Sequence, residues 1–380
     1  MFFVAYREIT HKNTRLLESK IELIESIGKI IVFMMILLSV FLFTVKTKNK
    51  VPNTIFGIYL LVITFDLIGL FTNKTLQYPA IQNLKVASSL LQLPLFYLYV
   101  LSACYSNFKI TKKHAIHFFL FIVFLVIFYI TDASNQSLLL YEIVSEIQFI
   151  SYIIAIFIVL KKYKTIYLEN YSNANYSVYK WLFQITLFSC IAHSFVLVRW
   201  FLSNSIYQEY VLNINLLISF SVLSITIFFV LKALYYPQLF TGINMNLEPL
   251  STTSKKKTKA LSAKESEVES QYLETLITFM NDKKPYLDFE LTLQKLSVKT
   301  EIPEKELSLL INHHLGKHFF DFINEYRIND AKKLLQAPSK KDLTVLEILY
   351  EVGFNSKSSF YSAFKKATNQ TPTQYRKSRV

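Results

Sequence analysis

The sequence predicts an all-α protein with two parts: an N-terminal bundle of seven transmembrane helices and a cytoplasmic domain of two helix-turn-helix units. Three observations lead to this prediction. Seven apolar segments of spanning length lie within residues 27–231, basic residues gather in alternate loops between them, and the C-terminal part shows a helix–turn–helix pattern twice. The composition agrees, because 52% of the 380 residues are hydrophobic, with 33 Phe and 24 Tyr.

The membrane part is defined by segments of about 20 residues, the length a helix needs to cross about 30 Å of hydrocarbon. The predicted spans are Ile27–Val45, Thr54–Phe71, Leu84–Tyr105, Ala115–Thr131, Leu138–Leu160, Trp181–Leu202 and Tyr210–Leu231.

The loops predict the orientation of these spans. Loops 46–53, 106–114 and 161–180 carry ten Lys or Arg residues, and the other three interior loops carry one. Basic loops stay on the cytoplasmic side, so the seventh span ends there and the chain after it is cytoplasmic. The sequence therefore predicts a multi-pass protein of the cytoplasmic (inner) membrane. Residues 1–26 would form an extracytoplasmic tail, which their equal numbers of acidic and basic residues permit but do not favour.

Ionisable residues inside the predicted spans are costly and mark candidate functional positions. The residues that fall in the outer half of the membrane are Asp66, Lys85, Glu142, Glu146 and Arg199. One interpretation is packing by interhelical pairs and snorkelling side chains. The other is a polar pocket, open to the outer side, that binds a small-molecule or membrane signal of unknown identity.

Several function classes find no support in the sequence. The glycines are too far apart for a phosphate-binding loop, and both cysteines, Cys104 and Cys190, lie within apolar spans rather than in a disulfide framework. His314 and His318 are four residues apart, but Gly316 interrupts a helix between them, so we predict no metal site. No catalytic arrangement is recognisable in the tail, and we predict a protein that is not an enzyme and needs no cofactor.

Residues 232–271 form a predicted cytoplasmic linker that is rich in Lys, Ser and Thr. Beyond it, the segment 291–300 predicts a supporting helix, and Pro303 suits the first turn of a second helix running to Ile311. A turn at Gly316 leads to a long helix of about Phe319–Gln336.

The second helix-turn-helix unit begins at Thr344. Gly353 forms its turn, its second helix begins near Ser356, and Asn369 and Pro372 end that helix.

From about residue 272 to 378 the chain resembles the DNA-binding domain of the AraC/XylS family of bacterial transcription regulators. The residues that carry the resemblance are Leu293, Leu296, Ser297, Leu307, Gly316, Phe322, Ile323, Tyr326, Arg327, Ala331, Leu334, Leu335, Ile348, Gly353, Phe354, Phe360, Phe364, Lys365, Lys366, Thr371, Pro372, Tyr375 and Arg376. Two positions depart from the family pattern. Asn369 stands where Gly is usual and tolerates a left-handed cap, and Leu349 stands where a small Ala is usual.

The resemblance implies two helix-turn-helix units, within a domain of residues 272–380, that insert one helix each into successive major-groove faces of double-stranded DNA. The implied base-reading residues are Lys305 and Ser308 in the first unit and Lys357, Ser358 and Ser362 in the second. The implied phosphate contacts are Lys365, Lys366 and Arg376. Grooves about 34 Å apart predict a site of roughly twenty base pairs per subunit. Glu304 and Glu306 repel phosphate, so the first unit is expected to read bases sparingly.

Together these features predict a membrane-integrated transcription regulator that senses a signal through its bundle. Two alternatives remain open: a transporter or enzyme with an autoregulatory DNA-binding tail, and a regulator for which the bundle is only an anchor. The signal, the promoter, the direction of regulation and the presence of a homodimer are left undetermined by the sequence.

Overall fold

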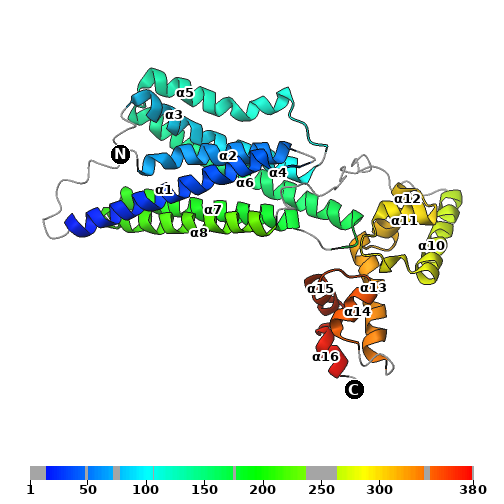
Figure 1. The fold of residues 1–380 in the computed structure, drawn as a ribbon. Coiled ribbons are helices and arrows are strands. Elements are labelled where there is room, and N and C mark those ends of the chain that lie inside the picture. The colour runs from blue at the N-terminus through cyan, green and yellow to red at the C-terminus, as the bar shows by residue number, and fades with distance from the viewer. Residues whose placement is uncertain are drawn as a thin grey trace. The chain divides into compact units, whose positions relative to one another are not determined.

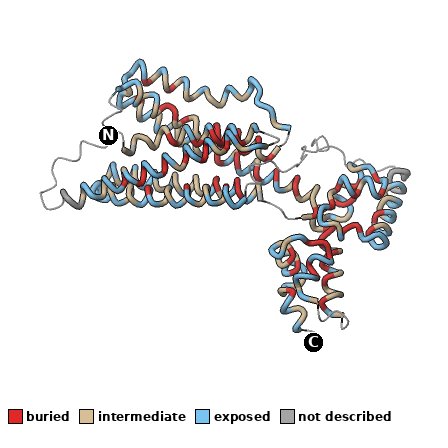
Figure 2. The backbone as a smooth tube through the Cα atoms, in the orientation of Figure 1, coloured by how far each residue is buried: buried red, intermediate tan, exposed pale blue. Residues whose placement is uncertain are grey.

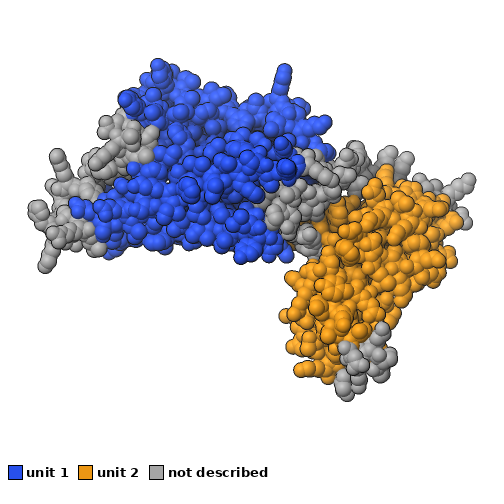
Figure 3. Space-filling model, in the orientation of Figure 1, with its two compact units in different colours: residues 1–161, 177–248 blue, residues 162–176, 249–380 orange. Residues whose placement is uncertain are grey.

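The computed structural model describes residues 14–47, 50–71, 78–105, 107–173, 177–236, 263–337 and 343–378. These residues are helical, with no strand among them, as predicted (Figure 1). The chain divides into two compact units, which are described separately: unit 1 comprises residues 1–161 and 177–248, and unit 2 comprises residues 162–176 and 249–380 (Figure 3).

Unit 1 is built from long apolar helices. In chain order they are α1 (Thr14–Thr44), α2 (Val51–Leu67) with the 3₁₀ turn η2 (Ile68–Leu70), α3 (Pro79–Ser88), η3 (Ser89–Leu91), α4 (Gln92–Cys104), η4 (Lys112–Phe118), α5 (Phe119–Thr131), α6 (Asn135–Asn170), α7 (Ser177–Ser203), η5 (Gln208–Tyr210) and α8 (Val211–Tyr235).

Within the described ranges, six helical segments are long and apolar enough to cross a membrane. The second predicted span is the exception, because α2 has only 17 residues. The count of seven spans therefore stays a prediction. Exposed residues run along these helices (Figure 2). They include large apolar residues such as Phe33 (67% exposed) and Tyr129 (81% exposed), as expected for surface in contact with lipid.

Two helices differ from their predicted lengths. Helix α1 begins at Thr14, so part of the predicted tail 1–26 is helical. Helix α6 has 36 residues and is about 54 Å long, more than the hydrocarbon thickness requires. Its last turns, from Lys162, group with unit 2 rather than with unit 1.

The interior of unit 1 includes an aromatic cluster that joins helices α2, α4 and α7. Phe56 stacks on Tyr99 with ring centroids 4.4 Å apart, and Trp181 meets Phe56 edge-on. The Trp181 indole N–H donates a hydrogen bond of 2.8 Å to the Tyr99 hydroxyl. A buried Trp needs such a partner, and this one fixes α7 against α4.

Unit 2 contains two groups of short helices at the positions where the sequence predicts the two helix-turn-helix units. Its helices are α10 (Ala263–Lys283), η6 (Pro285–Leu287), α11 (Leu293–Thr300), α12 (Glu304–Leu309), the π-helical turn η7 (Leu310–His314), α13 (Phe319–Gln336), α14 (Val345–Glu351), α15 (Lys357–Thr368) and α16 (Pro372–Lys377).

Helix α13 contributes to two separate hydrophobic cores and so joins the two helix-turn-helix units. Phe319, Phe322 and Ile323 pack in the first core with α10, α11 and α12. Ile328, Ala331 and Leu335 pack in the second core with α14 and α15. The predicted bounds Phe319–Gln336 are confirmed. A stripe of apolar residues on α13 therefore fixes both units to one rigid element.

The helix ends follow from local side chains. Thr344 caps α14 in a capping box with Glu347, and Thr371 caps α16 in a capping box with Gln374. Asn369 ends α15 in the left-handed conformation with φ of 57°, as predicted for an Asn at this position. Leu349 is fully buried, so the larger side chain fits the second core.

The first recognition helix differs from its prediction. Pro303 is the N-cap of α12 rather than a residue of its first turn. The α-helix ends at Leu309, and the chain continues to His314 as a π-helical turn. Gly316 then reverses the chain with φ of +63°, a conformation that glycine adopts without steric cost.

Candidate nucleic-acid interface and membrane polar cluster

Helix α15 presents the predicted base-reading residues of the second unit to solvent. Lys357, Ser358 and Ser362 are exposed, while Phe360 and Phe364 on the opposite face are fully buried. The Ser356 hydroxyl accepts a hydrogen bond from the Ser359 backbone N–H and starts the helix. Solvent-exposed hydroxyls and a cation on one face of a rigid helix can reach base edges in a major groove.

Helix α12 exposes fewer polar side chains that could contact bases than α15 does. Lys305 is exposed, and Ser308 is half-buried and accepts a hydrogen bond from the Asn312 side-chain amide. Glu304 and Glu306 lie in its first turn. With six residues and two carboxylates, α12 offers a shorter and less basic face than α15.

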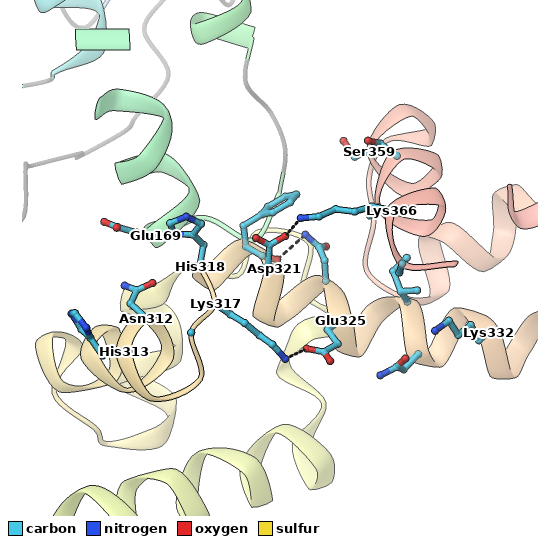
Figure 4. Close-up of a pocket in the computed structure, with 18 residues that line it drawn as sticks. Glu169, Asn312, His313, Lys317, His318, Asp321, Glu325, Lys332, Ser359 and Lys366 are labelled. Atoms are coloured by element: carbon cyan, nitrogen blue, oxygen red, sulfur yellow. Dashed lines mark hydrogen bonds and ion pairs between the residues drawn. The ribbon is translucent and has the colours of Figure 1, made fainter. Parts of the chain in front are cut away.

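Within unit 2, between its first and second helix-turn-helix units, lies a hollow of about 870 Å³ (Figure 4). Asn312 and His313 line it from the end of the first unit, and Ser359, Ser362 and Lys366 line it from α15. Helix α13 lines it from Phe320 to Lys332.

The three residues predicted to contact phosphate differ in their burial and in their partners. Lys366 forms an ion pair of 2.7 Å with Asp321 across the hollow, as Figure 4 shows. Arg376 is half-buried, and its Nη2 atom has no acceptor among the described residues. Lys365 is exposed on α15. A phosphate would therefore compete with Asp321 for Lys366 but not for Lys365.

Arg327 of α13 is a fully buried cation of unit 2, with only 1% of its surface exposed. Its Nε donates to the Tyr286 carbonyl (2.7 Å), and Nη2 donates to the Asp288 carbonyl (2.8 Å) and the Ser172 hydroxyl (3.1 Å). Its Nη1 donates to the Ser172 carbonyl (2.9 Å) and to Asn324 Oδ1 (3.3 Å). All five N–H donors are therefore used. Burial lowers the pKa of Arg327 to about 10, which leaves the group charged at neutral pH.

In unit 1, three of the predicted membrane residues come together. Asp66 accepts a side-chain hydrogen bond from Gln92 and interacts electrostatically with Lys85 and Arg199. The Lys85 side chain packs against Gly69, so closely that a Cβ atom at position 69 would lie 2.0 Å from Lys85 Nζ. We call Asp66, Lys85, Gln92 and Arg199 the membrane polar cluster.

The remaining two predicted residues lie on α6. Glu146 hydrogen-bonds His193 at 2.9 Å, and the His193 ring stacks on Phe149 at 3.6 Å. Glu142 is exposed. The Tyr141 hydroxyl hydrogen-bonds Ser89. Tyr141 also interacts electrostatically with Asp66, Glu142 and Glu146, which places these polar groups of α6 near the membrane polar cluster.

Sequence reasoning missed four residues of unit 2 that make specific contacts: Glu169, Ser172, Asn324 and Arg327. Arg327 occurs within the apolar stripe of α13, which is a signal for a buried cation, but its partners cannot be read from the pattern. Glu169 and Ser172 fall in the segment 161–180, which the sequence predicts as a polar loop, and nothing there distinguishes them from solvated residues.

The comparisons with known proteins agree with this geometry. A helix-turn-helix domain family, of the AraC type, matches residues 296–378. An uncharacterized HTH-type transcriptional regulator, YdeC of Bacillus subtilis (strain 168), is 34% identical over 88 residues, 23% of this chain and 29% of its own length. The HTH-type transcriptional regulator GlxA of Rhizobium meliloti (strain 1021) is 36% identical over 76 residues, 20% of this chain and 22% of its own length.

Among solved structures, a protein of unknown function from Listeria innocua is 27% identical, with 28% of this chain and 97% of that chain covered and a TM-score of 0.25. The chain spans less than a third of the length of the curated relatives described above. The similarity to known regulators thus concerns the C-terminal domain.

Proposed function

We propose that this protein is a membrane-integrated, sequence-specific DNA-binding transcription regulator that senses a signal through its membrane bundle. One observation carries the proposal: an AraC-type helix-turn-helix domain, with exposed cations and hydroxyls on α15, shares a chain with helices long enough to cross a membrane.

The proposed arrangement has a membrane domain at 27–231, a linker at 232–271 and a cytoplasmic DNA-binding domain at 272–380. The alternation of basic loops supports a cytoplasmic C-terminal domain. The grouping of residues 162–176 with residues 249–380 gives independent support, because loop 161–180 is one of the loops predicted to be cytoplasmic.

Base reading is assigned mainly to α15. Lys357, Ser358 and Ser362 are proposed to contact base edges, with Lys305 and Ser308 as the weaker counterparts on α12. Lys365, Lys366 and Arg376 are proposed to bind phosphates and so to set the register.

Signal detection is assigned to the membrane polar cluster together with Glu142 and Glu146. The charges there are interhelical, so a ligand that bound them in one arrangement of the helices would shift the bundle toward that arrangement. Substitution of Asp66, Glu146 and Arg199, at unchanged expression, is expected to alter the dose–response curve of a reporter gene. An unaltered curve would remove the sensor assignment while leaving the DNA-binding function intact.

The central test is selection of DNA sites by the full chain in lipid nanodiscs, followed by binding measurements at several salt concentrations. The expected result is a defined site with two blocks about one helical turn apart, bound more weakly by the Lys357→Ala variant. Lys299 is an exposed lysine on α11, outside both recognition helices, and gives the matched control Lys299→Ala. Absence of any selected sequence would contradict the proposed function.

A further inference from the structure

A short segment that follows the fifth predicted span belongs to unit 2. Helix α6 begins at Asn135 in unit 1, but its last turns and the chain as far as residue 176 group with the helix-turn-helix domain. We call residues 169–173 the docking segment. Its position is notable because the same helix carries Glu142 and Glu146 of the proposed sensor.

The docking segment makes backbone contacts with the start of α11. Tyr171 and Thr292 form an isolated antiparallel bridge, and the Ser172 N–H donates to the Leu291 carbonyl at 3.2 Å. The Ser172 hydroxyl donates to the same carbonyl at 2.7 Å. Asn173 donates its side-chain amide to the Phe289 carbonyl at 3.4 Å. Ser172 is 1% exposed, so this is a packed contact and not a surface touch.

The docking segment supplies hydrogen-bond acceptors to the buried Arg327 guanidinium. Two of the five Arg327 donors end on Ser172, one on its carbonyl and one on its hydroxyl. Asn324 also donates to the Ser172 carbonyl, at 3.4 Å. If the docking segment left, these donors would need water in its place, because a buried guanidinium without acceptors is unfavourable. The DNA-binding domain thus has a specific binding site for this segment on α13, the helix that joins the two helix-turn-helix units.

The first residue of the docking segment reaches the hollow between the two units. Glu169 lines the hollow together with Ser359, Ser362 and Lys366 of α15 (Figure 4). The Glu169 carboxylate interacts electrostatically with His313 and His318. A carboxylate in a hollow bordered by the proposed DNA contacts repels phosphate.

We propose that the docking segment is an internal ligand of the DNA-binding domain and holds it in a state of low affinity for DNA. Release of the segment, driven by a change at the other end of α6, exposes the hollow and raises the affinity. This inference rests on the proposed function, since it names the regulation of the same DNA-binding surface.

A reversible cross-link tests the docked state directly. Residues paired across an antiparallel bridge have Cα atoms about 4.5–5.5 Å apart, within the range that a disulfide spans. The full chain carrying Tyr171→Cys and Thr292→Cys, with the native cysteines removed as Cys104→Ala and Cys190→Ala, is oxidised in nanodiscs. Binding to the selected DNA site is then measured before and after reduction. The comparison within one variant cancels any effect of losing the Thr292 cap of α11.

The expected result is efficient disulfide formation and DNA binding at least about tenfold weaker in the oxidised form, restored by reduction. The parent with only Cys104→Ala and Cys190→Ala, treated identically, should not respond to oxidant. Failure to form the disulfide in folded protein would overturn the docking. Efficient formation with equal or tighter DNA binding would overturn the inhibitory role.

A second variant is designed to release the docking segment from its binding site rather than to hold it there. Ser172→Lys places a charged side chain where there is no room, on the segment rather than on the DNA-binding domain. We expect DNA binding about fivefold tighter than in the unmodified chain. Ser203→Lys, at an exposed serine near the end of α7, is the matched control and should have no effect. Unchanged or weaker binding by Ser172→Lys would contradict the proposal. If the reduced and unmodified chains select no DNA sequence at all, it is the proposed function that has failed.

Discussion

The two helix-turn-helix units share a plan but differ in what their surfaces offer. The second unit has a twelve-residue recognition helix, α15, with Lys357, Lys365 and Lys366 on its exposed face. The first has a six-residue recognition helix, α12, with two acidic residues in its first turn. Only the first unit, among the described residues, receives the docking segment, at Leu291 and Thr292. With the DNA contacts proposed above, this difference predicts a division of labour, in which the second unit makes most of the contacts with DNA and the first makes the contacts with the docking segment.

Arg327 lies on α13, the helix that joins the two helix-turn-helix units, and its replacement should lower the stability of unit 2 more than the other substitutions. Arg327→Leu removes the donor described for the Tyr286 carbonyl, while the Asp288 carbonyl keeps the Leu291 N–H and the Ser172 carbonyl keeps the Asn324 amide. It also removes the buried side chain that joins these carbonyls, and we expect a loss of about 4 kcal/mol of stability in unit 2. Both tryptophans lie in unit 1, so the measurement is hydrogen exchange of α13 peptides by mass spectrometry. Lys333→Leu, at an exposed lysine on the same helix, is the control. Unchanged protection of α13 in Arg327→Leu would mean that the buried network does not hold the units together.

The two turn glycines give a matched comparison of the units. A Cβ at Gly353 would lie 2.6 Å from the Tyr286 carbonyl oxygen, and its φ is +88°. Gly316 also has positive φ, +63°, but nothing lies within 4 Å of its Cβ position. We expect Gly353→Ala to cost about 3 kcal/mol and Gly316→Ala about 1 kcal/mol, because only the former adds a clash to the strain. Thermal unfolding of unit 2, followed by protease susceptibility, measures both. Equal costs would show that the backbone at Tyr286 moves to accept the methyl group.

The sequence predicted the second unit and the long helix more closely than the first unit. The spacing of buried Phe360 and Phe364 among exposed Lys and Ser residues predicts α15, and the apolar stripe of α13 predicts that long helix. These are local patterns, with a period set by the helix itself. The early end of α12 at Leu309 has no such signal, because the π-helical turn that follows contains residues of ordinary helical propensity.

The docking segment was beyond prediction for a different reason. Ser172 and Leu291 are 119 residues apart, and their contact is made mainly by backbone atoms and one hydroxyl. Nothing in such residues encodes a partner, whereas Asp66, Lys85 and Arg199 stand out as charges among apolar residues. Three of the five membrane residues predicted on that ground interact directly or through space, and Glu142 does not join them.

The division of labour predicts unequal effects of matching lysines on DNA binding. Lys357→Ala should weaken binding by about 1.5 kcal/mol and relax specificity at one position, while Lys305→Ala should have a clearly smaller effect. Lys365→Ala should weaken binding to all sequences and lower the slope of log K against log salt by about 1. Titration of the full chain with matched and mismatched sites separates these outcomes. A larger loss for Lys305→Ala than for Lys357→Ala would reverse the assignment of the two units.

The smallest expected effect is a difference between the supporting helices α11 and α14 in how their stability changes at low pH. Hydrogen bonds from the Thr344 hydroxyl and backbone N–H lower the pKa of Glu347 in the capping box of α14. A carboxyl group whose pKa is lower in the folded state stabilises the fold above its unfolded pKa of about 4.3 and loses that contribution as pH falls through the folded value.

The cap of α11 has Lys295 at the corresponding position, so it lacks this titration. We therefore expect hydrogen exchange in α14 to accelerate below about pH 4 in the unmodified chain relative to Glu347→Gln, with α11 the same in both. The glutamine keeps an acceptor oxygen but no proton equilibrium, which makes it the matched variant. A parallel pH response of α14 in the two proteins would mean that the capping box does not couple to proton binding. In that case the two supporting helices would be held by packing alone, and the units would differ in their DNA contacts but not in how their helices begin.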